Sequence, residues 1–201
     1  MHIKQDIFQR KFYSLLIAYS CMRPRIRMDI NKMQIINKEL EIQNLIEKLY
    51  GKDIHVREQA RYLLVNKGRD ATDYLLSLLQ SKNSNQRLEA VKLLGRIKDP
   101  SSASALVEML VDESIGVDWA ASNALIALGG NALLPLLNGL VKYYDSARFR
   151  QSAMHILHTF EQSGILEHHV QEVLDALRGV EPSASVPWAA ERAFEAISIH
   201  T

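Results

Sequence analysis

The stretch QRLEAVKLL at residues 86–94 decides the fold, because close variants of it return along the chain at a nearly constant interval. Each copy has an alanine at its centre and apolar residues three and four positions later. The other copies are VREQARYLL at 56–64, VDWAASNAL at 117–125, FRQSAMHIL at 149–157 and VPWAAERAF at 186–194. The five central alanines are separated by 30, 31, 32 and 37 residues; they are Ala60, Ala90, Ala121, Ala153 and Ala190.

A second pattern of apolar pairs, four residues apart, lies between these copies. Its intervals are 30, 31, 30 and 37 residues, so both patterns share one period and lengthen at the same place. The pairs are Leu45/Leu49, Leu75/Leu79, Leu106/Leu110, Leu136/Leu140 and Val173/Leu177.

Both patterns have the spacing of one face of an α-helix, since residues three and four apart lie on the same side. Turn-forming pairs such as Lys67-Gly68, Asp99-Pro100 and Gly129-Gly130 separate them, and no alternating strand pattern occurs. Each unit is therefore predicted to be a helix carrying the alanine (helix A), a tight turn, and a helix carrying the apolar pair (helix B). Neither helix can bury its apolar face alone, so neighbouring units must stack.

The sequence thus predicts an all-α fold, a right-handed α-α superhelix or α-solenoid of about four helical-hairpin repeats over residues 34–201. Half-repeats are expected to cap both ends, with a lone B-type helix near 35–50 and a lone A-type helix near 186–198. Residues 1–33 are predicted to form a basic N-terminal extension outside the fold.

The repeats resemble the armadillo-like HEAT-repeat family, in its short subtype named after phycobilisome lyases. The residues that carry the resemblance are Val56-Arg57 with Ala60, Gln86-Arg87 with Leu93-Leu94-Gly95 and Asp99-Pro100, and the run Ala124–Gly129. The resemblance covers about residues 34–197, and the run that begins at Asp145-Ser146 is similar to uncharacterised bacterial HEAT-repeat proteins. The resemblance to the HEAT-repeat family implies a fold more than a function, because the family includes scaffolds, adaptors and bilin lyases.

Composition places the chain among ordinary globular proteins. It has 201 residues, 47% of them hydrophobic, a net charge of +1 and one cysteine, which favours a reducing, cytoplasmic location. The basic residues gather at the start: residues 1–27 hold six bases and one acid. An apolar run at 12–18 is too short to span a membrane, which needs about 20 residues. Export as a lipoprotein through Cys21 is the alternative, and Met28 is a second candidate for the natural start.

An arginine recurs three positions before the central alanine, as Arg57, Arg87 and Arg150. Polar residues stand a few positions earlier, namely Asp53, Asn83 and Asp145, and the third repeat has Asp118 in the arginine position. The resemblance implies a structural ladder in which these pairs tie loops to helices.

No sequence motif for catalysis is present: the chain has no glycine-rich phosphate loop and no GxSxG. His155, His158, His168 and His169 lie close in sequence, but His155 and His158 are expected on the surface, with no acid at ligand spacing. We therefore expect no metal, no cofactor and no enzymatic activity.

The B helices are expected to line the concave side of the solenoid, and their non-core positions hold five acids and no base. This pattern disfavours nucleic acid, whose phosphates need Lys and Arg, and favours a protein partner with a basic patch. The candidate partner-binding residues are Asp73, Tyr74, Glu108, Asn138 and Asp175, followed by the exposed tryptophans Trp119 and Trp188.

The function predicted from the sequence is a non-enzymatic interaction or scaffold module. The alternative is a lyase-like or chaperone-like factor acting on a chromophore- or cofactor-carrying protein, as the resemblance implies. Oligomeric state is left open.

Overall fold

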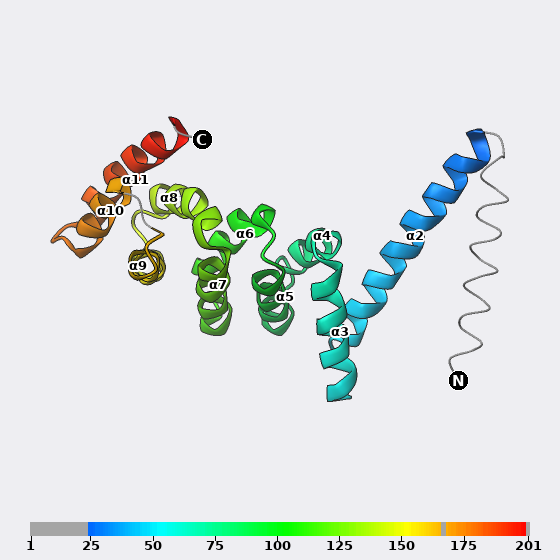
Figure 1. Ribbon diagram of the computed structural model, residues 1–201. Coiled ribbons are helices and arrows are strands. Elements are labelled where there is room, and N and C mark those ends of the chain that lie inside the picture. Colours follow the sequence, from blue (N-terminus) through cyan, green and yellow to red (C-terminus); the bar gives the residue numbers. More distant parts are fainter. Residues whose placement is uncertain (1–23, 166–167, 200–201) are drawn as a thin grey trace.

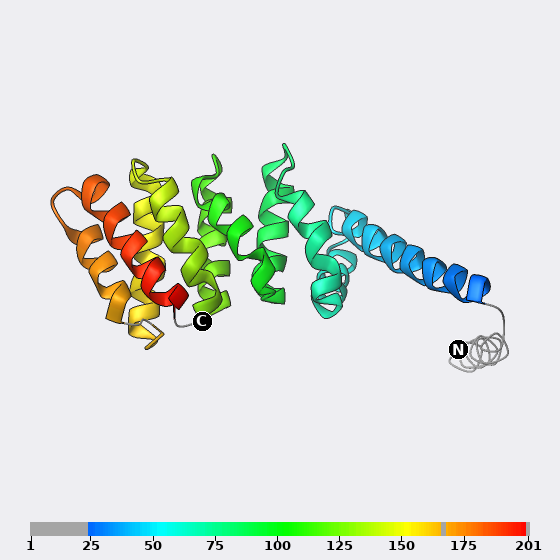
Figure 2. The same ribbon diagram turned by 90° about the horizontal axis from the view of Figure 1, so that it is seen from above.

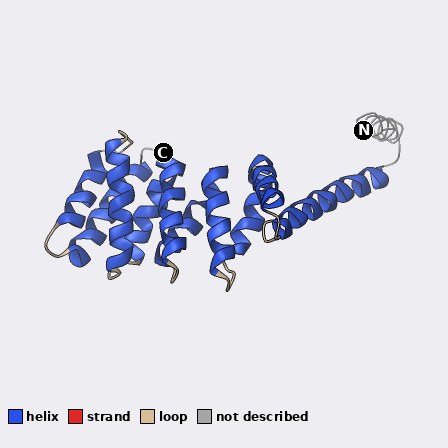
Figure 3. Cartoon of the chain, turned by 90° about the horizontal axis from the view of Figure 1, so that it is seen from below, coloured by secondary structure: helices blue, strands red, loops and turns tan. Residues whose placement is uncertain are grey.

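The computed structural model describes residues 24–165 and 168–199, which form an elongated stack of helices in two layers (Figure 1). One layer, the A layer, holds α3 (Ile54–Lys67), α5 (Ser84–Ile97), α7 (Ile115–Leu128) and α9 (Ala147–Gln162). The other, the B layer, holds α4 (Arg69–Leu78), α6 (Ala103–Glu108) and α8 (Leu133–Lys142). Short 3-10 turns flank α6 and precede α8; they are η1 (Pro100–Ser102), η2 (Met109–Val111) and η3 (Gly129–Ala132). The described residues contain no strand (Figure 3), and the predicted α-solenoid is confirmed.

Local sequence sets where the helices begin and end. Asp53 starts α3 by accepting hydrogen bonds from the backbone amides of His55 (2.8 Å) and Val56 (3.4 Å). Asn83 caps α5 and Ser146 caps α9 in the same manner. Three of the A helices, α3, α5 and α7, end on residues with positive φ, because the chain must reverse there into helix B; these residues are Gly68, Lys98 and Gly129.

Both sequence patterns form the core. The five repeated alanines are buried, and so are the ten members of the apolar pairs. Gly95 shows why small residues are needed: a Cβ on it would lie 2.8 Å from Cβ of Ala124, so α5 and α7 touch there almost backbone to backbone.

The N-terminal helix α2 (Pro24–Lys48) is longer than the expected helix at 35–50. It points away from the stack (Figure 2). Among its described side chains, which begin at residue 30, Ile42 is the first that is buried, followed by Leu45. The exposed part of α2 includes four apolar side chains, Met33, Ile35, Ile36 and Leu40. The expected boundary at residue 33 falls inside α2, and Cys21 lies outside the described residues.

The C-terminal helices depart from the predicted order. The sequence predicted a lone A-type helix near 186–198 as the C-terminal cap, and an A-type helix would lie in the A layer. Instead α11 (Pro182–Ile199) packs between α8 and α10 (His168–Arg178), on the B-layer side (Figures 1 and 2). Its narrow face of small residues, Val186, Ala189, Ala190 and Ala193, is buried in this contact, which allows a close approach to α8. The longer final interval of 37 residues leaves enough chain for this return.

One segment, Ile115–Lys142, is long and apolar enough to suggest a membrane span by composition. It is not a continuous helix, because Gly129 has a φ of +61° and separates α7 from α8. About half of its most apolar part is buried against neighbouring helices. Neither α7, with 14 residues, nor α8, with 10, reaches the length of about 20 that a span needs, so the segment is the centre of the core.

Candidate functional site

The five candidate residues on the B helices do not form one acidic surface. Glu108 accepts hydrogen bonds from Lys142 Nζ (2.8 Å to each oxygen) and from the hydroxyl of Tyr143. Burial alone would raise the pKa of Glu108, but these bonds outweigh it and lower the pKa below its usual range. Lys142 was missed because the positions considered on this helix ended at Asn138, and Lys142 follows four residues later.

The remaining candidates are scattered over three helices, namely α4, α8 and α10. Asp175 lies 3.8 Å from Arg178 of the same helix, while Asp73 and Asn138 are exposed and Tyr74 is half-buried. None of these residues lines the two hollows of the A layer, which lie between α5 and α7 and between α7 and α9.

The arginine ladder exists, but its partners differ from those expected. Arg57 donates to the carbonyl of Gly51 (2.8 Å), Arg87 to that of Ser81 (2.8 Å) and Arg150 to that of Tyr144, always six residues earlier. The expected pairing of Arg57 with Asp53 is wrong, because the Asp53 carboxylate is used to cap α3. Arg150 likewise binds a loop carbonyl rather than Asp145, which is exposed. A helical side chain leans toward the N-terminus, which brings each guanidinium to the loop before its helix.

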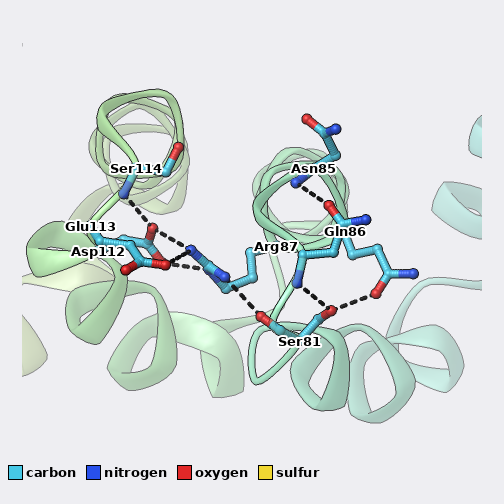
Figure 4. A network of polar contacts seen from close by, with 8 residues as sticks. Ser81, Asn85, Gln86, Arg87, Asp112, Glu113 and Ser114 are labelled. Atoms are coloured by element: carbon cyan, nitrogen blue, oxygen red, sulfur yellow. Dashed lines mark hydrogen bonds and ion pairs between the residues drawn. The ribbon is translucent and has the colours of Figure 1, made fainter.

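Arg87 alone among these arginines also pairs with a buried carboxylate (Figure 4). Its Nε lies 2.7 Å from Oδ2 of Asp112 and its Nη2 2.9 Å from Oδ1. Asp112 in turn accepts from the backbone amide of Ser114. Burial would raise the pKa of Asp112, but the bonds from Arg87 and Ser114 outweigh it and lower the pKa.

In the third repeat Asp118 stands in place of the arginine. Here the A helix supplies the carboxylate, and the next A helix supplies the arginine. Asp118 accepts from Arg148 Nε (2.9 Å) and Ser152 Oγ (3.1 Å) of the next A helix. Nη2 of Arg148 is buried and has no hydrogen-bond partner among the described residues. The ladder therefore positions A helices relative to one another and to their loops.

The hollowed surface lies on the A layer, where sequence reasoning had not placed it. A groove of about 780 Å³ runs between α5 and α7. Its floor is made of small residues, including Gly95, Ala120 and Ala124. Lys92 and Arg96 form the rim on α5, while Trp119 and Asn123 form the rim on α7.

Trp119 stands between this groove and a second hollow of about 340 Å³ between α7 and α9. Its side chain is 62% exposed, and its ring stacks on His155 with 5.7 Å between ring centroids. The stacking contact favours this orientation of a large apolar group on the surface. Trp188 stands, like Trp119, two positions before the central alanine of its repeat and is 72% exposed. It belongs to α11, however, which packs on α8 and α10 outside the A layer, so the two tryptophans lie on different layers.

The histidines do not form a metal site among the residues that the structure describes. His155 contacts Trp119, and His158 lies 3.0 Å from Glu161. His169 is exposed, and the side chain of His168 is outside the description. Within the described ranges, no three His, Cys, Asp or Glu residues are placed to hold one ion.

A two-layered stack of helix pairs with interhelical ties and a hollowed helical face defines a helical-repeat protein of the solenoid class. A family model described as HEAT repeats matches residues 42–117 and 72–158, which together cover more than half of the chain. The chain belongs to the HEAT-repeat family. This match is to HEAT repeats in general and does not support the phycobilisome-lyase subtype.

Comparisons with individual proteins add little. No curated protein matches the chain. Eighteen chains of solved structures match. One of them is the crystal structure of an engineered protein, 16% identical, which aligns over 76% of this chain and 77% of its own with a TM-score of 0.38.

Proposed function

We propose that this protein is a non-enzymatic interaction module that binds a protein partner on the hollowed surface of the A layer, which α5, α7 and α9 form. HEAT repeats commonly mediate protein–protein interaction, and this supports the general class of function. The observation that carries the choice of face is Trp119, an exposed aromatic residue that stacks on His155 between two hollows. Binding energy in protein interfaces concentrates on such anchors.

The test is affinity capture of the tagged full-length protein at its native level, followed by mass spectrometry. Trp119→Ala should lose a stoichiometric protein partner that the unchanged protein retains. Trp188→Ala is the matched control, because it removes an equally exposed tryptophan from a helix outside the A layer.

A third variant tests the B layer, where the sequence had placed the partner. Asp73→Lys combined with Asp175→Lys reverses one exposed charge on α4 of the B layer and one on α10. Loss of the partner in this variant, with retention in Trp119→Ala, would transfer the binding face to the B layer. Capture of no stoichiometric protein by the unchanged chain would contradict the proposed function.

A further inference from the structure

We infer that the groove between α5 and α7 binds an acidic helical segment of a protein partner. This inference rests on the function proposed above. The groove has two unlike rims. Its α5 rim carries Lys92 and Arg96, whereas the described residues on its α7 rim carry no charge.

The charges along the groove are unbalanced. Glu89 is the one acidic residue lining it, and Arg61 already binds Glu89, with 3.1 Å between Nη2 and Oε2. Arg61 also contacts Glu58 at 2.5 Å. Lys92 and Arg96 are exposed and have no ion-pair partner among the described residues. Two positive charges on the groove are thus left for a partner.

The spacing of these cations indicates the shape of the partner. Lys92 and Arg96 are four residues apart on α5, so they stand one helical turn apart on the same side. Carboxylates three or four residues apart on a second helix would have the same separation. An amphipathic helix lying along a groove between two helices is an established way to recognise a peptide.

The floor and the other rim define the apolar side of the same segment. Gly95, Ala120 and Ala124 are small and buried, so α5 and α7 lie close together and the larger rim side chains stand on either side of an apolar floor. Trp119 offers a flat apolar surface to an aliphatic or aromatic side chain. The segment therefore combines two carboxylates on one side with an apolar residue on the other.

A nucleic acid fits this groove less well than an acidic protein. Phosphate backbones are bound by rows of Lys and Arg, and affinity depends on how many phosphates are neutralised. Here two cations stand over an apolar floor. The experiment below nevertheless gives nucleic acid its own outcome.

The experiment is a selection of displayed random peptides of about 16 residues, long enough for four helical turns, on the immobilised full chain. Selected peptides should be rich in Asp and Glu at helical spacing, with one large apolar residue. Their affinity should fall about tenfold or more in Lys92→Glu/Arg96→Glu, because attraction becomes repulsion. The control Lys52→Glu/Lys82→Glu changes two exposed lysines in the loops before α3 and α5 and should alter affinity less than about twofold.

The outcomes separate this inference from the proposed function. Peptides that need Trp119 but show no acidic excess and ignore the Lys92/Arg96 reversal would overturn the acidic partner and leave the binding face intact. No selected peptide, or peptides indifferent to Trp119→Ala, would overturn both. Binding of a mixed-sequence oligonucleotide at Lys92 and Arg96 more tightly than the peptides would replace the protein segment with nucleic acid.

Discussion

Arg87 and Asp112 form two parallel hydrogen bonds across a repeat boundary, at 2.7 and 2.9 Å, with side chains only 8% and 6% exposed. Arg87 also holds the carbonyl of Ser81, and Asp112 also accepts from Ser114 (Figure 4). One ion pair therefore connects the loop before α5 with the loop before α7. Such a pair orients its surroundings more than it adds net stability, but removal of one partner is costly.

Arg87→Ala should lower the free energy of unfolding by about 3–5 kcal/mol, because Asp112 would be left buried without its counter-ion. Urea denaturation measures this loss. Arg57→Ala is the control, since Arg57 is half-buried and binds only two loop carbonyls; it should cost about 1 kcal/mol. Equal losses of free energy in the two variants would show that the unpaired Asp112 carboxylate does not cause the destabilisation in Arg87→Ala.

Acid should weaken the stack through its buried carboxylates. Burial opposes ionisation of Asp112 and Asp99, yet their hydrogen bonds prevail and lower both pKa values. A carboxyl whose pKa is lower when folded stabilises the fold above its unfolded pKa of about 4. This stabilisation is lost as the pH falls through the lower, folded pKa.

The measurement is the free energy of unfolding at several pH values from about 6 to about 3. Asp112→Asn should show a shallower decline than the unchanged protein, because an amide does not titrate. A decline of unchanged slope in this variant would assign the acid sensitivity to other groups.

Gly95→Ala should destabilise the protein, although alanine favours a helix over glycine by about 1 kcal/mol. The new Cβ would lie 2.8 Å from Cβ and 2.9 Å from Cα of Ala124, so α5 and α7 must move apart. Overpacking costs about 1–3 kcal/mol, and the gain in helix propensity offsets about 1 kcal/mol of it, so we expect a net loss of up to about 2 kcal/mol in thermal or urea denaturation. Gly116→Ala has open space around its Cβ and should be neutral or stabilising; a stabilised Gly95→Ala would disprove the close contact.

Deletion of residues 1–33 should change the free energy of unfolding by less than about 1 kcal/mol. The side chains of residues 31–41 are exposed, and Ile42 is the first buried side chain among those described from residue 30 onward. Leu45→Ala should cost about 2–5 kcal/mol, since Leu45 is buried against the first repeat. A large loss in the deletion variant would place the start of the fold before residue 34.

The periodic part of the fold was predictable because an α-helix has 3.6 residues per turn. Its buried side chains therefore recur every three or four positions, and the sequence shows this spacing directly. Ala121 and Leu136 belong to columns whose burial follows from spacing alone. The position of α11 was not predictable in this way. VPWAAERAF at 186–194 has the pattern of an A helix, but a face of small residues can pack on any neighbour, and here it packs on α8.

The candidate site was harder to predict for a different reason. Exposed columns were assigned to faces one helix at a time, whereas the groove depends on how α5 and α7 lie side by side. Lys92 and Trp119 line one groove although they belong to different repeats. The signal that could have found them is a small residue on each of the two helices, Gly95 and Ala124. Two helices that meet at small residues lie close together, and the larger side chains beside the contact form the two rims of a groove.

The return of α11 onto α8 changes the order in which the molecule should come apart. In a simple stack each unit contacts only its neighbours, so either end can fray one repeat at a time. Here α8 and α11 are joined although α9 and α10 lie between them in the chain. Amide hydrogens from α8 to α11 should therefore exchange as one cooperative group, whereas those of α2 and α3 should exchange earlier and independently.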